Sequence, residues 1–466
     1  MTYRLILSGV LVAASAVAGC TDDTPLCTAD GLRDALAAAT SGETIHVGAC
    51  SITGSFVVPE GVSLSGAGRG STEIVAMDDE PAIRLLPGES ATRVEDLDVT
   101  SGERVAVLAM GSGRAALARV GVTATRGIAF GAESLSELTM EEVELSGPVT
   151  SATATSVSPD ATYEDTAIIG AIVTAVDSAT LTDVTASGFA SYGFVSVATN
   201  FTWSGGGAPR NLGTGLLVHG GSADLRGLSL GENLAGLMPL PVAGVFASGA
   251  TVETSDLQVD ASEGLGLLHD NVTVHHTDLI ASDNADVALW VQRCPSFELS
   301  GSLSELVGNR FSAIALFDTV ETVISGARID ETAEGVKIDG ELGTITVGDG
   351  VQAVTPGSTL VLRDLELSGN QRVGVLVDLT ESEATLALED VVVDGTGDSL
   401  GVVAQGRTAV DGWDDGVTRS GATEENDQAI TEPLPTIGAR YTDDDPSAMI
   451  ILDQGVAGII GDCGYQ

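Results

Sequence analysis

The fold is decided by a stretch that reads Asp256-Leu257-Gln258-Val259, then Gly266-Leu267-Leu268-His269, then Asp278-Leu279 and Ala288-Leu289-Trp290-Val291. Each phrase returns after 22 residues. Apolar residues alternate with other residues inside each phrase, and a period of two is typical of a short strand with one buried face. Because no helical pattern lies between the phrases, the stretch predicts coils of chain that stack on one another.

The same two phrases run through most of the chain. The first is a carboxylate or small residue before apolar-x-apolar, as in Asp96-Leu97-Asp98-Val99, Glu142-Val143-Glu144-Leu145, Asp364-Leu365-Glu366-Leu367 and Asp390-Val391-Val392-Val393. The second is Gly or Ala before apolar-x-apolar, as in Gly215-Leu216-Leu217-Val218, Gly335-Val336-Lys337-Ile338 and Gly401-Val402-Val403-Ala404. Longer steps mark insertions near 150–165, 234–243 and 340–358. The repeat predicts a parallel β-solenoid of about a dozen coils, in which stacking buries the apolar faces.

Composition agrees with a folded, turn-rich β protein. Of the 466 residues, 43% are hydrophobic, 4% are aromatic and 58 are glycine, while only 18% are charged. This balance excludes a disordered acidic chain. The formal net charge is −46. Such a surface repels phosphate backbones, so the sequence excludes a nucleic-acid partner.

The N-terminus has the features of a secretion signal. Arg4 precedes an apolar run from Leu5 to Ala18, which is shorter than the ~20 residues that span a bilayer. The run ends in Val17-Ala18-Gly19-Cys20, which resembles the lipobox of bacterial lipoproteins. The resemblance implies cleavage after residue 19, a lipid on Cys20 and a membrane as partner. With Thr21 next and no twin arginine, we expect a bacterial cell-envelope protein of the outer membrane or cell surface.

Four further cysteines remain, an even number that favours disulfides in an oxidising compartment. Cys27 and Cys50 flank one short helix-plus-strand unit, and the sequence predicts that they form a disulfide. Cys294 and Cys463 would then form a second disulfide that fastens the C-terminal tail to the middle of the domain. No pair has the spacing of a zinc site.

The opening of the repeat carries a family resemblance. The residues in question are Leu32-Arg33-Asp34-Ala35-Leu36-Ala37-Ala38-Ala39, Gly42-Glu43-Thr44-Ile45-His46-Val47 and Gly61-Val62-Ser63-Leu64-Ser65-Gly66-Ala67-Gly68. They resemble the start of right-handed parallel β-helix proteins of the pectin-lyase-like superfamily. The resemblance implies a right-handed parallel β-helix whose N-terminal end is plugged by a short helix, here at Asp30–Thr40. We therefore expect four segments: a signal peptide at 1–19, a tether at 20–26, the β-helix with its cap at 27–410, and an acidic C-terminal cap or tail at 411–466.

Enzymes with this fold act on acidic polysaccharides, and their motifs are present here only as fragments. A polygalacturonase-type hydrolase would carry a Gly-His-Gly and an Arg-x-Lys, of which Val218-His219-Gly220 and Gly335-Val336-Lys337 keep parts. A lyase would use an arginine base, and Arg328 is the best candidate, with Glu366 outward in the same column one or two coils on. A polyuronate substrate needs a cationic cleft, yet Lys337 is the only lysine.

A column of carboxylates precedes the buried strand residues, at Asp96, Glu142, Asp183, Asp256, Asp278, Asp364 and Asp390. Asp256 and Asp278 fall on adjacent coils, where a Ca²⁺ ion would find clustered oxygens. The alternative, which we favour, is that these are turn residues at strand entry. Similarly, Asn233, Asn284, Asn309 and Asn370 predict a stacked series of turn asparagines. His269 faces the core and His275 and His276 face opposite sides, so no metal centre is expected.

The second phrase has an outward column that is unexpectedly apolar. It contains Phe246, Leu268 and Trp290 on successive coils, and the same face carries Asp270, Gln292 and Lys337. A contiguous apolar strip indicates a surface that something covers. One hypothesis is a ligand-binding face, with a sugar chain stacked on the aromatic rings and the polar residues as its rim. The other is that the C-terminal tail covers the strip.

These observations favour a non-catalytic, lipid-anchored bacterial surface protein that binds a polysaccharide or other polymer, or serves as a rigid adhesive or structural rod. The alternative is a polysaccharide lyase or glycoside hydrolase of the same superfamily. No cofactor is expected, apart from Ca²⁺ at the carboxylate column.

Overall fold

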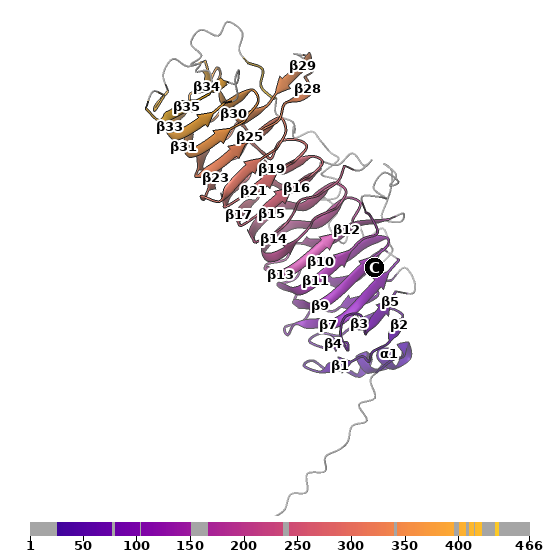
Figure 1. Ribbon diagram of the computed structural model, residues 1–466. Helices are drawn as coiled ribbons and strands as arrows, with labels where there is room; N and C mark the ends of the chain where they lie inside the picture. Colours follow the sequence, from indigo (N-terminus) through magenta and orange to yellow (C-terminus); the bar gives the residue numbers. More distant parts are fainter. Residues whose placement is uncertain are drawn as a thin grey trace, which may run out of the picture.

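The chain folds as a parallel β-helix whose coils stack into a rod (Figure 1). The computed structural model describes residues 26–76, 80–102, 104–150, 166–235, 242–339, 343–395, 400–406, 410–413, 415–421 and 434–437. The right-handed parallel β-helix predicted from the sequence is confirmed, with about 14 coils in place of a dozen.

Each coil contributes a strand to three parallel sheets. The first sheet contains β3 (Phe56–Val58), β6 (Ile83–Leu85), β8 (Val105–Met110), β10 (Gly127–Glu133), β12 (Ala167–Thr174), β14 (Tyr192–Gly207), β15 (Thr214–Arg226), β16 (Ala243–Ser248), β19 (Leu265–Asp270), β22 (Leu289–Gln292), β25 (Ser312–Phe317), β30 (Asp349–Val354), β32 (Val373–Asp378) and β34 (Leu400–Gln405).

The second sheet follows along each coil. It contains β1 (Thr44–His46), β4 (Ser63–Ser65), β7 (Thr92–Ser101), β9 (Arg114–Ala124), β11 (Glu137–Ser146), β13 (Ala179–Ser187), the later parts of β14 and β15, β17 (Thr251–Ser255), β20 (Thr273–Thr277), β23 (Ser296–Ser300), β26 (Glu321–Ser325), β31 (Thr359–Ser368) and β33 (Thr385–Asp394).

The third sheet completes the coil. It contains β2 (Ser51–Thr53), β5 (Glu73–Val75), β18 (Gln258–Asp260), β21 (Ile280–Ser282), β24 (Ser304–Val307), β27 (Ala327–Asp330), β35 (Val417–Ser420) and the ends of the long strands β7, β9, β11, β13, β14, β31 and β33. One antiparallel hairpin, β28 (Gly335–Asp339) and β29 (Gly343–Val347), is inserted between β27 and β30. The last strand, β35, lies past residue 410, inside the segment predicted as a C-terminal cap.

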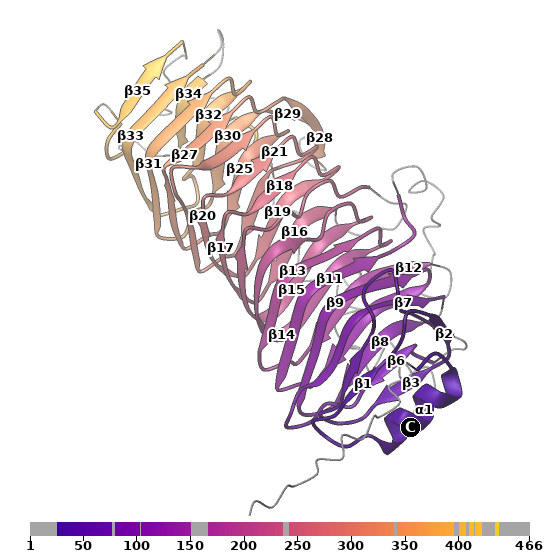
Figure 2. The same cartoon turned by 60° about the horizontal axis from the view of Figure 1, so that its bottom comes forward.

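Helix α1 (Ala29–Ala38) covers the N-terminal end of the rod, as Figure 2 shows. The Thr28 hydroxyl caps it by accepting a hydrogen bond of 3.2 Å from the Gly31 N–H. Leu32 and Leu36 are buried against the first coils, so the helix removes apolar core from water at an otherwise open end. The helix predicted at Asp30–Thr40 is therefore confirmed. In the described ranges, no helix is long and apolar enough to cross a membrane.

The coil turns its corners with residues in the left-handed conformation. At the corner between the second and third sheets these are Asp96, Arg119, Glu142, Asp183, Asp256, Asp278, Asp364 and Asp390, with φ between 50° and 57°. Aspartate tolerates this conformation better than most residues because its short side chain can hydrogen-bond locally. The predicted carboxylate column is thus a stack of corner residues.

An asparagine ladder fastens the corner between the third and first sheets. Each ladder asparagine follows a left-handed residue and is buried. Asn233 Oδ1 accepts from the Asn211 N–H of the preceding coil at 3.0 Å, and Asn309 Oδ1 accepts from the Asn284 N–H at 3.1 Å. The stacked series predicted at Asn233, Asn284, Asn309 and Asn370 is confirmed, and Asn211 extends it. The ladder satisfies turn N–H groups that the strands leave unpaired.

Two histidines meet inside the core. His269 on β19 and His276 on β20 are fully buried, with their Nε2 atoms 3.0 Å apart, and the Thr254 hydroxyl lies 2.8 Å from His276 Nδ1. His269 Nδ1 is buried without a partner. A buried nitrogen without a partner costs less as an acceptor than as an N–H donor, so His269 Nδ1 is assigned as unprotonated. His269 Nε2–H then donates to His276 Nε2, and His276 Nδ1–H donates to the Thr254 hydroxyl. His276 was expected to face away from His275, and it does.

This histidine pair makes stability depend on pH. Burial lowers the pKa of His269 to about 3, and burial together with its histidine neighbours lowers the pKa of His276 well below its ordinary value. The unfolded chain therefore binds more protons below pH ~6.5, and stability falls as the pH drops from there toward 3. We expect a loss of about 1 kcal/mol per histidine between pH 6.5 and 5.5.

Chemical unfolding at the two pH values measures the loss. The double variant His269→Val, His276→Leu should show little of it, while His275→Gln, on the exposed face of the same strand, should keep it. An equal pH dependence in all three proteins would contradict the assignment.

Candidate functional site

The strip predicted to bind a ligand lies in the first sheet and is buried. Phe246, Leu268 and Trp290 are in register on β16, β19 and β22, as expected, but their exposed fractions are 8%, 0% and 0%. The Trp290 ring stacks on Phe317 with centroids 4.8 Å apart, and its Nε1–H donates to Gln292 Oε1 at 3.1 Å. The expectation of an open ligand face was wrong.

The reason is a second apolar layer on the outside of the first sheet. Its strands carry apolar residues on both faces, and the outer set forms a cluster of its own. Ile345 and Val347 of β29 and Ile437 of the C-terminal segment belong to that cluster. Of the segment predicted as a tail, residues 434–437 reach the outer face of this sheet at β30 and β34, through Ile437 and Leu434. That the tail also covers the strip at Phe246, Leu268 and Trp290 stays a prediction.

The predicted rim does not form a binding site either. Asp270 accepts a hydrogen bond of 2.8 Å from Arg293 Nε in a partly buried ion pair, and Gln292 is 1% exposed. Lys337 was placed in the outward column, but it lies on β28 of the inserted hairpin, and Gln352 takes its place opposite Ala315. The insertion displaced the repeat phrase that contains Lys337 from the coil.

Arg328 and Glu366 are neighbours on adjacent coils of the third sheet, as predicted. Arg328 pairs with Asp330 and lies 3.8 Å from Glu305. The hydrogen bond to Asp330, with the charges around it, raises the pKa of the Arg328 guanidinium. Two carboxylates, those of Asp330 and Glu305, therefore lie beside this guanidinium.

The residues predicted to bind a metal ion and those predicted to form disulfides have different outcomes. Asp256 and Asp278 are corner residues, and Asp278 Oδ1 accepts from the Leu303 N–H at 3.1 Å. Across the described ranges, no three His, Cys, Asp or Glu side chains are grouped to hold a metal ion. The predicted disulfide between Cys27 and Cys50 is formed.

The predicted disulfide between Cys294 and Cys463 was wrong, because Cys294 is a free thiol inside the core. It follows the left-handed corner residue Arg293, which turns its side chain inward, where Sγ accepts from the Val272 N–H at 3.4 Å. Burial raises the pKa of this thiol to about 11. Cys20 and Cys463 lie outside the described residues.

An open groove of about 620 Å³ lies where the third sheet turns into the first, and we call it the corner groove. It crosses five successive coils, and its polar lining consists of Ser146, Thr150, Ser187, Arg210, Glu232 and Glu263. Val149 and Leu234 also line it, and both belong to a small apolar cluster with Ala190 and Leu212.

The asparagine ladder positions the charged residues of this groove. Arg210 and Glu232 are the left-handed corner residues directly before Asn211 and Asn233, so each points outward while its asparagine is held inside. Arg210 Nε lies 3.9 Å from Glu232 Oε2, and both side chains are about two-thirds exposed, at 66% and 63%. Glu263 Oε2 accepts from the Ala235 N–H at 2.8 Å. None of these charged residues was predicted from the sequence, although the spacing of the ladder asparagines carries the signal.

A smaller depression of about 270 Å³ lies on the outer face of the second sheet. Its lining includes Asn200, Ser222 and Thr251 from one row, with Asp224 and Glu253 beside them. Arg226, which is not part of this lining, pairs with Asp224 from the edge of the depression.

Comparison with known proteins gives likeness of fold alone. No family model matches the chain, and no curated protein matches it. The mannuronan C-5 epimerase AlgE6 A-module of Azotobacter vinelandii is 14% identical, with 84% of this chain and 93% of that one covered and a TM-score of 0.36. A GH87 alpha-1,3-glucanase catalytic domain is 11% identical over 74% and 63%, with a TM-score of 0.42. Tailspike protein 3 of bacteriophage CBA120 is 11% identical over 89% and 58%, with a TM-score of 0.40. These similarities assign no activity.

Burial of the central aromatic residue has a measurable consequence. Trp290→Ala should lower the free energy of unfolding by about 3–5 kcal/mol, because it leaves a cavity between the sheet and its outer layer. Leu303→Ala is the control, since Leu303 is 63% exposed and should cost no more than about 0.5 kcal/mol. Urea unfolding measures both, and an unchanged stability of Trp290→Ala would show that this face is open.

Proposed function

We propose that the protein is a non-catalytic rod of a bacterial envelope that binds a polysaccharide lengthwise in the corner groove. The observation that carries the proposal is the extent of this groove, which runs along the rod over five coils, ~20 Å at the spacing of β-strands. Its volume is typical of ligand sites. An open groove along the axis suits a long chain better than a small molecule.

The lining suits a hydroxyl-rich ligand. Serine and threonine hydroxyls both donate and accept hydrogen bonds, Arg210 donates, and the carboxylates of Glu232 and Glu263 accept. Arg210 is the only cationic side chain among the described residues of the lining. With a net charge of −46, the protein repels a strongly anionic polymer. A neutral or weakly charged polysaccharide is therefore the ligand class we propose.

The envelope location rests on the N-terminal sequence. With a lipid on Cys20, only six residues would separate the membrane anchor from Cys27, where the disulfide closes the start of the β-helix. Acyl chains contribute ~0.8 kcal/mol per buried CH₂, and two or three of them anchor a protein stably. The rod would then project its groove from the envelope surface.

Glycan binding by the full chain tests the ligand. On a panel of neutral polysaccharides, Arg210→Ala should weaken retention about tenfold, because it removes the donor at the centre of the groove. The matched control is Arg226→Ala, an exposed arginine that is likewise paired with a carboxylate. If both variants retain the glycan as well as the native protein does, the corner groove is not the binding site. A loss confined to Arg226→Ala would assign binding to the depression on the second sheet.

The same incubations test the enzymatic alternative, a lyase or hydrolase at the adjacent Arg328 and Glu366. We expect neither unsaturated nor new reducing sugar ends. Product that disappears in Arg328→Ala would replace the proposed function with catalysis.

Lipidation is tested separately. When the full gene is expressed in a bacterium, the protein should partition into detergent and incorporate labelled palmitate, and Cys20→Ser should abolish both. Palmitate labelling that survives in Cys20→Ser would contradict the anchor.

A further inference from the structure

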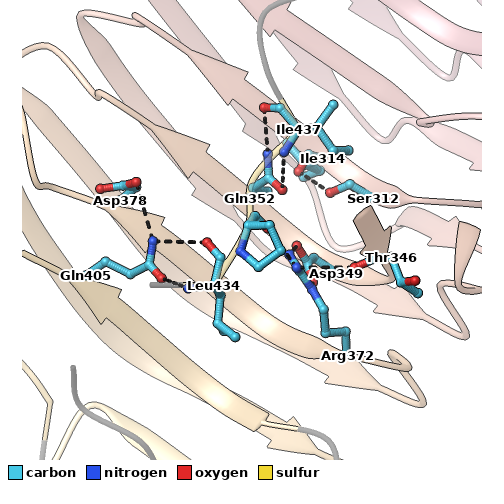
Figure 3. A network of polar contacts seen from close by, with 11 residues as sticks. Ser312, Ile314, Thr346, Asp349, Gln352, Arg372, Asp378, Gln405, Leu434 and Ile437 are labelled. Atoms are coloured by element: carbon cyan, nitrogen blue, oxygen red, sulfur yellow. Dashed lines mark hydrogen bonds and ion pairs between the residues drawn. The ribbon is translucent and has the colours of Figure 1, made fainter. Parts of the chain in front are cut away.

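The C-terminal residues 434–437, which we call the strap, lie on the outer face of the first sheet at its C-terminal end (Figure 3). Gln352 on β30 accepts from the Ile437 N–H at 3.2 Å and donates to the Ile437 carbonyl at 3.3 Å. Gln405 on β34 accepts from the Leu434 N–H at 2.6 Å and donates to the Leu434 carbonyl at 3.4 Å. Each side-chain amide thus pairs with a backbone as a neighbouring strand would.

The strap runs across the strands, along the axis of the rod. β30 and β34 are two coils apart, ~10 Å at the spacing of strands, which three residues of extended chain can span. The strap goes from the last coil back toward the middle of the rod, because Leu434 contacts β34 and Ile437 contacts β30. Gln352 and Gln405 are 0% and 1% exposed.

Two apolar anchors accompany the backbone contacts. Ile437 is 3% exposed and joins the outer apolar layer, and Leu434 packs on the cluster of Val373, Leu376 and Val403. The backbone contacts therefore hold the strap extended, and the two apolar anchors favour Leu at position 434 and Ile at position 437.

Arg372 fixes the middle of the strap. Its Nη1 donates to the Pro435 carbonyl at 2.7 Å and to the Thr346 carbonyl of β29 at 3.4 Å. The guanidinium is also paired with Asp349 on β30, which is fully buried, and Arg372 is itself 13% exposed. A proline suits this position because only its carbonyl is contacted. One arginine therefore ties the strap, the inserted hairpin and the first sheet together.

From these contacts we infer that the outer face of β30, β32 and β34 is a docking site for an extended peptide, and that its occupant is the strap of the same chain. The site recognises a peptide backbone through two glutamine amides and one guanidinium, with a Leu at the first and an Ile at the fourth position. The strap is a ligand joined to its site by the chain between Gly421 and Leu434, so it binds as an intramolecular ligand at high effective concentration.

Hydrogen exchange of the full chain tests the site. In the double variant Gln352→Ala, Gln405→Ala, the amides of Leu434 and Ile437 should exchange about a hundredfold faster, tenfold for each lost amide pair. In Gln258→Ala, on the exposed third sheet, they should exchange as in the native chain. Unchanged exchange of these amides in the double variant would overturn the inference. So would exchange in the native protein that is already as fast as in an unfolded chain.

Two readouts distinguish release of the strap from unfolding of the coils and from docking of a second chain. The amides of Val375 and Val403 in β32 and β34 should stay protected in the double variant, which shows that the coils are intact. If they lose protection, the double variant Leu434→Ala, Ile437→Ala, which leaves the coils untouched, replaces it: faster exchange of residues 434 and 437 in this variant, with Val375 and Val403 still protected, supports the inference. Protection of the strap should be independent of protein concentration; protection that rises with concentration would assign the occupant to a second copy of the chain.

Discussion

A coil without an insertion has to turn three corners within about 22 residues, and the rest of the structure depends on how it does so. At most of the described corners one residue takes a left-handed backbone conformation, and where it is not glycine it is most often aspartate at the corner between the second and third sheets. A corner of fixed shape sends the chain into the next strand in the same register as the coil before. The parallel ladders, the asparagine ladder and the continuous core all follow from that repeated register.

Fixed corners also determine where the surface differs from one coil to the next. Strand residues are tied to their neighbours above and below, so variation collects at corners, where an insertion leaves the register intact. The corner between the third and first sheets receives the β28–β29 hairpin and the corner groove. Scaffold and candidate site are thus adjacent parts of one coil: Asn211 inside the corner and Arg210 outside it.

Much of the fold could be predicted from the sequence because each signal was local. Alternating apolar residues indicated strands, the recurring aspartates indicated turns, and the spacing of Cys27 and Cys50 indicated a disulfide, and the structure confirms all three. Position along the repeat also placed Glu366 beside Arg328.

The errors have one physical origin: a strand with apolar residues on both faces does not say what lies on its outer side. Trp290 looked exposed because the pattern counts one core, whereas the first sheet has an apolar layer on each side. Lys337 left the column because an insertion of unknown shape intervened, and Cys294 turned inward because Arg293 before it is left-handed. Arg210 and Glu232 meet across a corner, through contacts that no single repeat contains.

The most direct test of the stacked coils is a set of distances between spin labels on one row of the second sheet. Asn200, Thr251 and Thr385 lie in one row, seven and five coils apart for the pairs Asn200–Thr385 and Thr251–Thr385. With Cys20, Cys294 and Cys463 replaced by alanine and cysteines introduced at these positions, double electron–electron resonance should give narrow distributions near ~34 Å and ~24 Å, which is ~4.8 Å for each coil. Distances that do not grow in proportion to the number of coils would contradict the register on which the whole account rests.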